Sequence, residues 1–389
     1  MRQFPRQMGF PSDVLYNRGV VTRLGEQGSA FGSRGLLVHS RSMRQSGAVD
    51  RVLESAPQGV EIVPWQHRGG EPTLDDVEAA RSRAGELDPS WIGALGGGSV
   101  LDLAKACAGL RHSGASAAEH HAGLPVETPG LPFLAAPATA GTGSEATGVS
   151  VLIDGTTGKK KAIRSPGMLA ARVLLDADLL ATCPGRTIAD SGMDALTQAV
   201  ESLLSTGATR FTRMLAGEGC RLIAASLPEV YEDPGTENAE DLLLGSFLTG
   251  MAFSSSRLGV VHGLAHPLGG YFNVSHGRVC GVCLPLALEL NREAVPERYE
   301  ELRELLAGDP INRIHELLND LEVQNPFQGM SLENAEAIVR ETLESGSTAH
   351  NPKPVTDGDM RWFLGCLFGE SVGQLISESV GQRPEISRW

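Results

Sequence analysis

Aromatic residues are scarce in this sequence, long hydrophobic runs are missing, and acidic residues outnumber basic ones. Phe, Trp and Tyr make up 5% of the 389 residues, which suits an α/β or helical protein better than a β-sandwich. No apolar run reaches the roughly 18 residues of a membrane-spanning helix, and the N-terminus lacks the apolar core of a signal peptide. The net charge of −14 would repel nucleic acids and anionic membranes. We therefore expect a cytoplasmic protein with no nucleic-acid or membrane partner.

Cysteine spacing gives no sign of a disulfide framework. Six cysteines are present, and only Cys280 and Cys283 form a C-x-x-C pair. No second pair completes a zinc site, and no thioredoxin-like βαβ pattern surrounds this one. We interpret all six as free thiols, with the pair in a protein core.

The first half of the chain alternates short apolar runs with helical patterns. Strands are expected at 35–39, 60–63, 91–95 and 133–136, and a strand pair at 148–153 and 160–165. Strands that alternate with helices predict a parallel, doubly wound sheet.

After about residue 184 the apolar residues recur at helical spacing only. Helices are expected at 189–204, 210–227, 239–253, 299–306, 312–321, 332–344 and 359–367. The sequence thus predicts an α/β domain over 1–184 and an all-helical domain over 185–389, with ligands bound between them.

Two loops of the α/β half favour nucleotide binding. Gly96-Gly97-Gly98-Ser99 follows an expected strand and opens a helix, where the backbone can approach a phosphate and Ser99 could cap the helix together with Asp102. This is not the G-x-G-x-x-G pattern, so alone it could be an ordinary tight turn. The loop 137–145, with small and hydroxyl side chains, follows the next strand, and two such loops at successive strand ends predict a nucleotide site. A lysine of the run 159–161 could pair with the cofactor, unless the run is a solvated turn.

The helical half contains a candidate metal site. Asp194 and Gln198 are spaced to share one helix face, His262 and His266 repeat that spacing, and His276 follows. A carboxylate with imidazoles suits a divalent first-row metal, which could polarise a carbonyl. The other interpretation is a set of hydrogen-bonded core histidines. The following histidines are expected to be solvated or to cap helices: His67, His112, His120, His121, His315 and His350.

Together these blocks resemble the iron-containing, group III metal-dependent alcohol dehydrogenases. The resemblance runs from about residue 19 to residue 351 and rests on four ordered blocks: GGGS with Asp102, TAGTGSE at 139–145, SGMDALT at 191–197, and the histidines of 262–277. It implies a dehydroquinate synthase-like fold, in which a doubly wound dinucleotide-binding domain precedes a helical metal-binding domain. It also implies a homodimer.

The resemblance implies a role for each matching residue. The cofactor NAD(P)(H) would be bound by Gly97, Gly98, Ser99, Asp102, Thr139, Thr142 and Lys160. A divalent metal, Fe²⁺ or Zn²⁺, would be held by Asp194, Gln198, His262 and His276. His266 would lie beside the substrate and relay a proton. The implied reaction is hydride transfer between nicotinamide and a small alcohol or aldehyde, whose oxygen the metal polarises.

Two positions depart from the family pattern. Gln198 stands where the family usually has His, and a neutral amide oxygen is a weaker ligand, so a metal-independent enzyme of the maleylacetate reductase type is an alternative. After the first strand the chain reads His39-Ser40-Arg41, without the Asp that NAD-preferring members place there. Ser40 and Arg41 could bind a 2′-phosphate, so NADPH is expected to be accepted and even preferred. A lyase of the dehydroquinate synthase type and an inactive nucleotide-binding relic are further alternatives.

Overall fold

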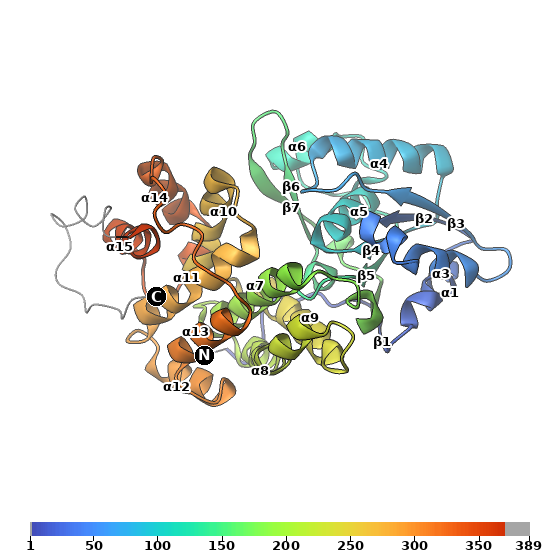
Figure 1. Cartoon of the computed structure of the whole chain (residues 1–389). Coiled ribbons are helices and arrows are strands. Elements are labelled where there is room, and N and C mark those ends of the chain that lie inside the picture. Colours follow the sequence, from blue (N-terminus) through green and yellow to red (C-terminus); the bar gives the residue numbers. More distant parts are fainter. Residues whose placement is uncertain (1, 370–389) are drawn as a thin grey trace.

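An α/β half is followed in the chain by a helical half (Figure 1). The computed structural model describes residues 2–369, so the last part of the predicted helical domain, residues 370–389, lies outside the described residues. Six parallel strands form one sheet in the order β1-β8-β5-β4-β2-β3. Their bounds are β1 (Val14–Tyr16), β2 (Arg34–His39), β3 (Glu61–Gln66), β4 (Trp91–Gly96), β5 (Phe133–Pro137) and β8 (Arg172–Leu175). The predicted parallel, doubly wound sheet is confirmed.

The strand pair and six helices complete this half. The antiparallel pair consists of β6 (Val149–Ile153) and β7 (Lys160–Arg164). The helices are α1 (Leu24–Ser29), α2 (Arg41–Gln45), α3 (Ala48–Glu54), α4 (Leu74–Leu87), α5 (Gly98–Leu110) and α6 (Ala117–Ala122). Strands β1 and β8 have only 3 and 4 residues, too few to show a period, and were not predicted.

The central strands are apolar throughout because they are covered on both faces. Leu36 and Val38 of β2 join the core on one side of the sheet, whereas Leu37 and the β4 residue Leu95 join the core on the other. Burial on both faces produces continuous apolar runs instead of alternation. This is why the strands were visible in the sequence.

The helical half has nine helices among the described residues. They are α7 (Gly185–Leu204), α8 (Arg210–Glu232), α9 (Asn238–Ser256), α10 (Val260–Phe272), α11 (His276–Asn291), α12 (Pro296–Leu305), α13 (Pro310–Asp320), α14 (Ala335–Glu344) and α15 (Asp357–Phe368). All seven predicted helices are present. Helices α10 and α11 were not predicted, because Pro267, Pro285 and several glycines interrupt their pattern.

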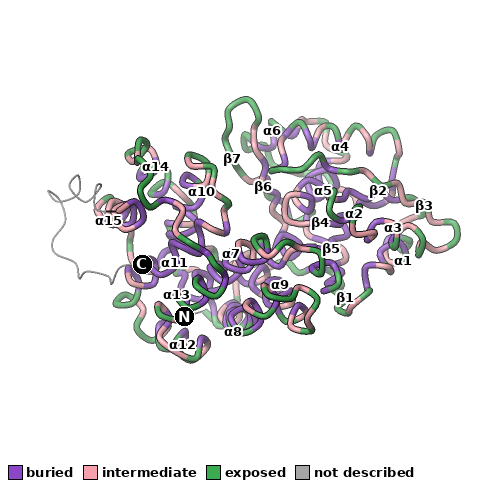
Figure 2. The backbone as a smooth tube through the Cα atoms, viewed as in Figure 1, coloured by how far each residue is buried: buried purple, intermediate pink, exposed green. Residues whose placement is uncertain are grey.

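Helix α7 lies at the centre of the helical half and is buried over most of its length (Figure 2). It packs against α8, α9 and α11. Close backbone contacts join the two halves: a Cβ at Gly143 would lie 2.6 Å from the Cα of Gly250 in α9, and one at Gly141 would lie 2.7 Å from Ser191 in α7. The loop 137–145 is thereby held against α9 and against α7, the helix that carries Asp194 and Gln198.

Three histidines correct the sequence analysis. His67, His120 and His121 are buried, not solvated. His120 is hydrogen-bonded through Nε2 to Ser113 and through Nδ1 to the Leu124 carbonyl, so local partners replace water. All six cysteines are free thiols, as predicted. No described helix combines the length and the apolar character needed to span a bilayer.

Candidate active site

The predicted cofactor residues lie where the strand order of the sheet reverses. From β2 the chain continues outward to β3, whereas from β4 it continues to β5 on the other side. Ligands of open α/β sheets bind outside the strand ends at such a point. Ser40 and Arg41 follow β2, and Gly97 and Gly98 follow β4. The Ser40 N–H donates to the Leu95 carbonyl at 3.1 Å, which keeps the two strand ends together.

Of the two side chains that follow β2, Ser40 is engaged in a hydrogen bond and Arg41 is not. Ser40 caps α2, since its Oγ accepts a hydrogen bond from the Met43 N–H at 3.2 Å. Arg41 is exposed, and within residues 2–369 it makes no hydrogen bond or ion pair. Its guanidinium is therefore available to an anion.

The two predicted nucleotide loops contact each other. A Cβ at Gly98 would lie 2.7 Å from Cγ2 of Thr142, and one at Gly97 would lie 3.3 Å from Thr139. Any side chain at Gly98 would displace the second loop. The structure thus brings together four residues that the sequence could only place on separate strand ends.

The predicted helix cap is wrong in detail. The N-cap of α5 is Gly97, not Ser99. The Asp102 carboxylate faces the second loop instead, where it accepts hydrogen bonds from Ser144 Oγ at 2.5 Å and from the Val151 N–H at 2.9 Å. Asp102 therefore links α5, the loop 137–145 and β6.

A buried lysine beside Asp102 was missed by the sequence analysis. Lys105 is 0% exposed, and its Nζ donates to the carbonyls of Ser144 and Val149, both at 2.6 Å. Nζ also lies 3.7 Å from Asp102, and burial lowers the Lys105 pKa. Burial also raises the pKa of nearby Glu145 to about 7. The available signal was a lysine three residues after Asp102 in a helix whose other side chains are mostly apolar.

Four side chains that could bind a metal meet between α7, α10 and α11: the predicted ligands Asp194, His262 and His276, and Cys280, which was not predicted. Asp194, His262, His276 and Cys280 each offer a ligand atom, and these four atoms lie within 4.8 Å of one another. The Asp194 Oδ1 is 3.3 Å from His262 Nε2 and 3.7 Å from His276 Nε2. Gln198, one turn after Asp194, is 4% exposed, and its Oε1 has no hydrogen-bond partner in the described residues. A buried donor set with an unpartnered amide oxygen fits a divalent cation.

A second buried carboxylate positions His262. Glu201 lies two turns after Asp194 on α7, and its Oε2 is 2.7 Å from His262 Nδ1. A carboxylate only accepts, so Nδ1 carries the proton and Nε2 faces Asp194. Glu201 also accepts the N–H groups of Gly259 at 3.0 Å and Val261 at 2.6 Å, which fixes the start of α10. The sequence analysis missed Glu201, although its seven-residue spacing from Asp194 indicated a shared helix face.

The remaining candidates, His266 and Lys160, lie close to this cluster. The His266 ring stacks on His276 with centroids 5.0 Å apart. Desolvation by the surrounding protein lowers the pKa of His266 well below 6.5, and the His276 ring and the Lys160 charge lower it further. Desolvation also lowers the pKa of His276 to about 4. Lys160, ion-paired with Glu71 at 3.1 Å, is thus within electrostatic reach of the histidines from β7.

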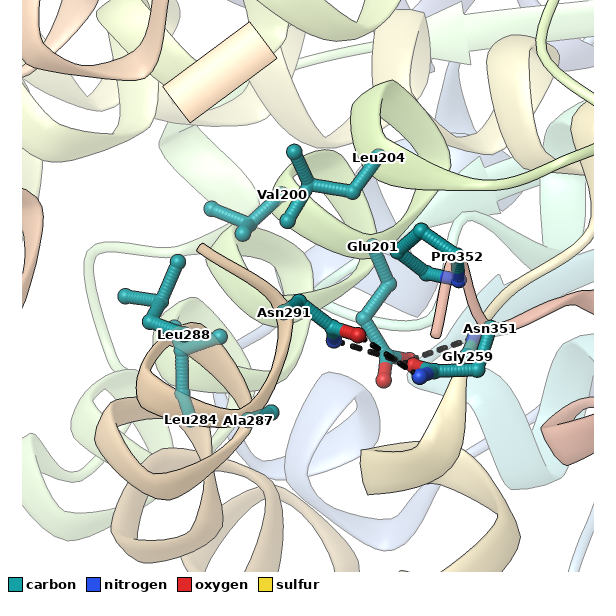
Figure 3. Close-up of a pocket in the computed structure, with 10 residues that line it drawn as sticks. All are labelled: Val200, Glu201, Leu204, Gly259, Leu284, Ala287, Leu288, Asn291, Asn351 and Pro352. Atoms are coloured by element: carbon teal, nitrogen blue, oxygen red, sulfur yellow. Dashed lines mark hydrogen bonds between the residues drawn. The ribbon is translucent and has the colours of Figure 1, made fainter. Parts of the chain in front are cut away.

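A small cavity is lined by Glu201 and by polar and apolar side chains around the start of α10 (Figure 3). Asn291 and Asn351 point toward each other there and exchange side-chain hydrogen bonds of 3.1 and 2.7 Å. Asn351 Oδ1 also accepts the Val260 N–H at 3.3 Å. The polar groups of this cavity are thus engaged in holding the start of α10.

Comparisons with known proteins agree with this arrangement. Residues 11–177 match the model of the iron-containing alcohol dehydrogenases, and residues 188–365 match that of the C-terminal part of the Fe-containing alcohol dehydrogenase family. The chain is 33% identical over 354 residues to "Probable alcohol dehydrogenase EutG" of Escherichia coli K12, covering 88% of this chain and 90% of that one. It is 28% identical to an NADPH-dependent butanol dehydrogenase of Clostridium saccharobutylicum, covering 92% and 97%. A sulfoacetaldehyde reductase from Bifidobacterium kashiwanohense, solved in complex with NAD⁺, superimposes with a TM-score of 0.88 at 26% identity, covering 93% and 98%.

Proposed function

Because the chain belongs to the iron-containing alcohol dehydrogenase family and is an oxidoreductase that acts on CH–OH groups, we propose that it interconverts a small aldehyde and its alcohol with NADPH and a divalent metal. One observation carries the proposal. The buried donor cluster lies beside His266 and within electrostatic reach of Lys160, which belongs to the cofactor-binding half. The nicotinamide and the substrate carbonyl would meet between the donor cluster and the cofactor-binding half.

The proposed metal ligands are the predicted residues Asp194, Gln198, His262 and His276. When bound, a divalent metal supplies Lewis acidity toward a carbonyl oxygen. The protein's part is to orient the donors: Glu201 fixes the His262 ring, and Gly277 permits close packing of α11 on α7, because a Cβ there would lie 1.9 Å from the Asp190 carbonyl oxygen.

His266 is the proposed proton relay. Its lowered pKa keeps the imidazole neutral, so it can accept the alcohol proton during oxidation and release it to water, and during reduction it can take a proton from water and pass it to the alkoxide oxygen. His266 is surrounded by protein atoms that desolvate its ring, yet the residue keeps solvent-accessible surface, which gives it a route for proton exchange with water.

We propose that Gly97, Gly98, Ser99 and Asp102 border the cofactor phosphates and ribose, and that Thr139, Thr142 and Lys160 border the path to the nicotinamide. The free guanidinium of Arg41 and the Ser40 hydroxyl support NADPH, because no carboxylate follows β2 to repel a 2′-phosphate.

A kinetic comparison tests both parts. Protein purified without chelator and loaded with Fe²⁺ or Zn²⁺ is assayed on a panel of small aldehydes with NADPH and NADH. We expect metal-dependent reduction, and Arg41→Ala should lower kcat/KM with NADPH while leaving that with NADH unchanged. An advantage for NADH of about tenfold, roughly 1.4 kcal/mol, would contradict the NADPH proposal.

The alternatives make different predictions. A metal-independent enzyme of the maleylacetate reductase type would keep its activity after metal removal. An inactive relic would bind NADPH tightly yet turn over no aldehyde. The lyase alternative is not supported, since both family matches are to alcohol dehydrogenases.

The setting of the enzyme completes the proposal. We propose a cytoplasmic homodimer whose domains meet at residues 184 and 185, where α7 begins. Sedimentation gives the subunit number, cell fractionation the location, and limited proteolysis the boundary.

A further inference from the structure

Cys280 has the position of a metal ligand, although the sequence pattern suggested only a core thiol. It lies on α11 one turn after His276, so both side chains project from one helix face. Its Sγ is 3.6 Å from His276 Nε2 and 3.9 Å from His262 Nε2. The thiol is buried, and among the described residues no other cysteine belongs to this donor group.

Four of the six distances between the donor atoms are close to those of a tetrahedral site. With metal–sulfur bonds of about 2.3 Å and metal–nitrogen bonds of about 2.0–2.1 Å, tetrahedral angles place nitrogen and sulfur about 3.5 Å apart, and nitrogen and oxygen about 3.4 Å apart. The structure has sulfur–nitrogen distances of 3.6 and 3.9 Å and oxygen–nitrogen distances of 3.3 and 3.7 Å. These four distances exceed the tetrahedral values by at most about 0.4 Å, and all four donor atoms lie within 4.8 Å of one another.

Gln198 leaves a need for such a ligand. It is the one neutral amide among the predicted ligands, and its amide oxygen is a poor substitute for imidazole. A thiolate would restore a strong fourth donor and would add a negative charge to that of Asp194. Asp194 alone supplies the carboxylate of the cluster.

We propose that Cys280 is a ligand of the catalytic metal, completing a set with Asp194, His262 and His276 in which a sulfur takes the place of the weak Gln198 donor. This rests on the proposed metal-dependent function and deepens it. On binding, the thiol gives its proton to water and the sulfur forms a bond to the metal, with no change of oxidation state. A soft thiolate favours zinc over ferrous iron, so the enzyme selects Zn²⁺.

Cobalt substitution tests the proposal without reference to activity. Co²⁺ bound to the wild-type protein should show sulfur-to-cobalt charge-transfer absorption in the near ultraviolet. Cys280→Ser should lose that band, whereas Cys283→Ser, which alters a buried thiol three residues away, should keep it. The wild-type spectrum alone reports sulfur ligation, so the test does not depend on folding of the Cys280 variant.

Affinity gives a second readout. In competition with a chromogenic chelator, Cys280→Ser should bind Zn²⁺ at least roughly tenfold more weakly, since even changes outside the ligand shell cost about 10- to 100-fold. Cobalt bound without a sulfur band, with equal Zn²⁺ affinity in Cys280→Ser, would overturn the inference and leave the proposed function intact. A wild-type protein that binds neither metal would overturn both.

Discussion

Lys105 in the α/β half and Glu201 in the helical half are both buried beside the candidate site, and the two residues are used differently. Lys105 of the α/β half donates mainly to neutral oxygens of the loop and strand that border the cofactor residues. Glu201 of the helical half accepts backbone N–H groups at the start of α10 and also the ring N–H of His262. Lys105 thus holds a loop in place, whereas Glu201 holds both the start of α10 and the predicted metal ligand His262.

Because of this difference, we expect one residue to affect mainly the stability of the fold and the other to affect mainly metal binding. A buried charge is costly unless its hydrogen bonds are complete, and both residues meet that condition. Lys105 does not touch a predicted metal ligand, so its loss should appear mainly in folding. Glu201 touches His262, so its loss should appear mainly in metal binding.

Lys105→Met should have the largest effect on stability. The substitution removes the Nζ hydrogen bonds to the carbonyls of Ser144 and Val149 and the cation near Asp102. We expect the free energy of unfolding to fall by roughly 3–5 kcal/mol, measured by urea denaturation. Lys159→Met, at an exposed position, is the control and should leave stability unchanged. A loss below about 1 kcal/mol would show that the network is not held by the Lys105 charge.

Glu201→Gln should have its main effect on the metal. The amide cannot accept from several N–H groups as a carboxylate does, so the His262 ring loses its orienting partner. Zn²⁺ affinity should fall roughly 10- to 100-fold, measured by chelator competition. The exposed Glu232→Gln is the matched control. Unchanged affinity in the Glu201 variant would separate the carboxylate from the metal site.

The two halves were also unequally visible in the sequence. The sheet could be predicted because its central strands are buried on both faces and its glycine loops are contiguous motifs. Contact between Gly98 and Thr142 could not be predicted, because it depends on the pairing of β4 with β5.

In the helical half the ligands could be predicted by residue type, but the helices that carry two of them could not. Pro267 and Pro285 lie inside α10 and α11 and mask their periodicity, and tertiary packing outweighs that local cost. Cys280 showed only an apolar neighbourhood in the sequence. Its proximity to His262 arises from the packing of α11 beside α10, which no local pattern encodes.

Gly98→Ala tests the cofactor side with a smaller effect. Its Cβ would lie 2.7 Å from Thr142, so the loop must shift at a cost of roughly 1–3 kcal/mol. We expect weaker NADPH binding in a fluorescence titration. Gly85→Ala in α4, where a Cβ would meet nothing within 4 Å, is the control and should raise stability by about 1 kcal/mol without affecting NADPH. Wild-type affinity in the Gly98 variant would place the cofactor away from this contact.

Arg257→Gly tests whether the backbone is strained at the junction that leads into α10. Arg257 has φ 68° and ψ 179°, a region adopted almost only by glycine. Relief of that strain, of order 1–3 kcal/mol, outweighs the greater freedom of glycine in the unfolded chain, about 0.5–1 kcal/mol. We therefore expect a net gain near 1 kcal/mol in thermal unfolding, and none for Arg257→Ala, which keeps the Cβ. Equal stability of both variants would mean that the backbone relaxes at this position. Loss of activity in both, despite the gain in Arg257→Gly, would show that the strain is retained for the guanidinium.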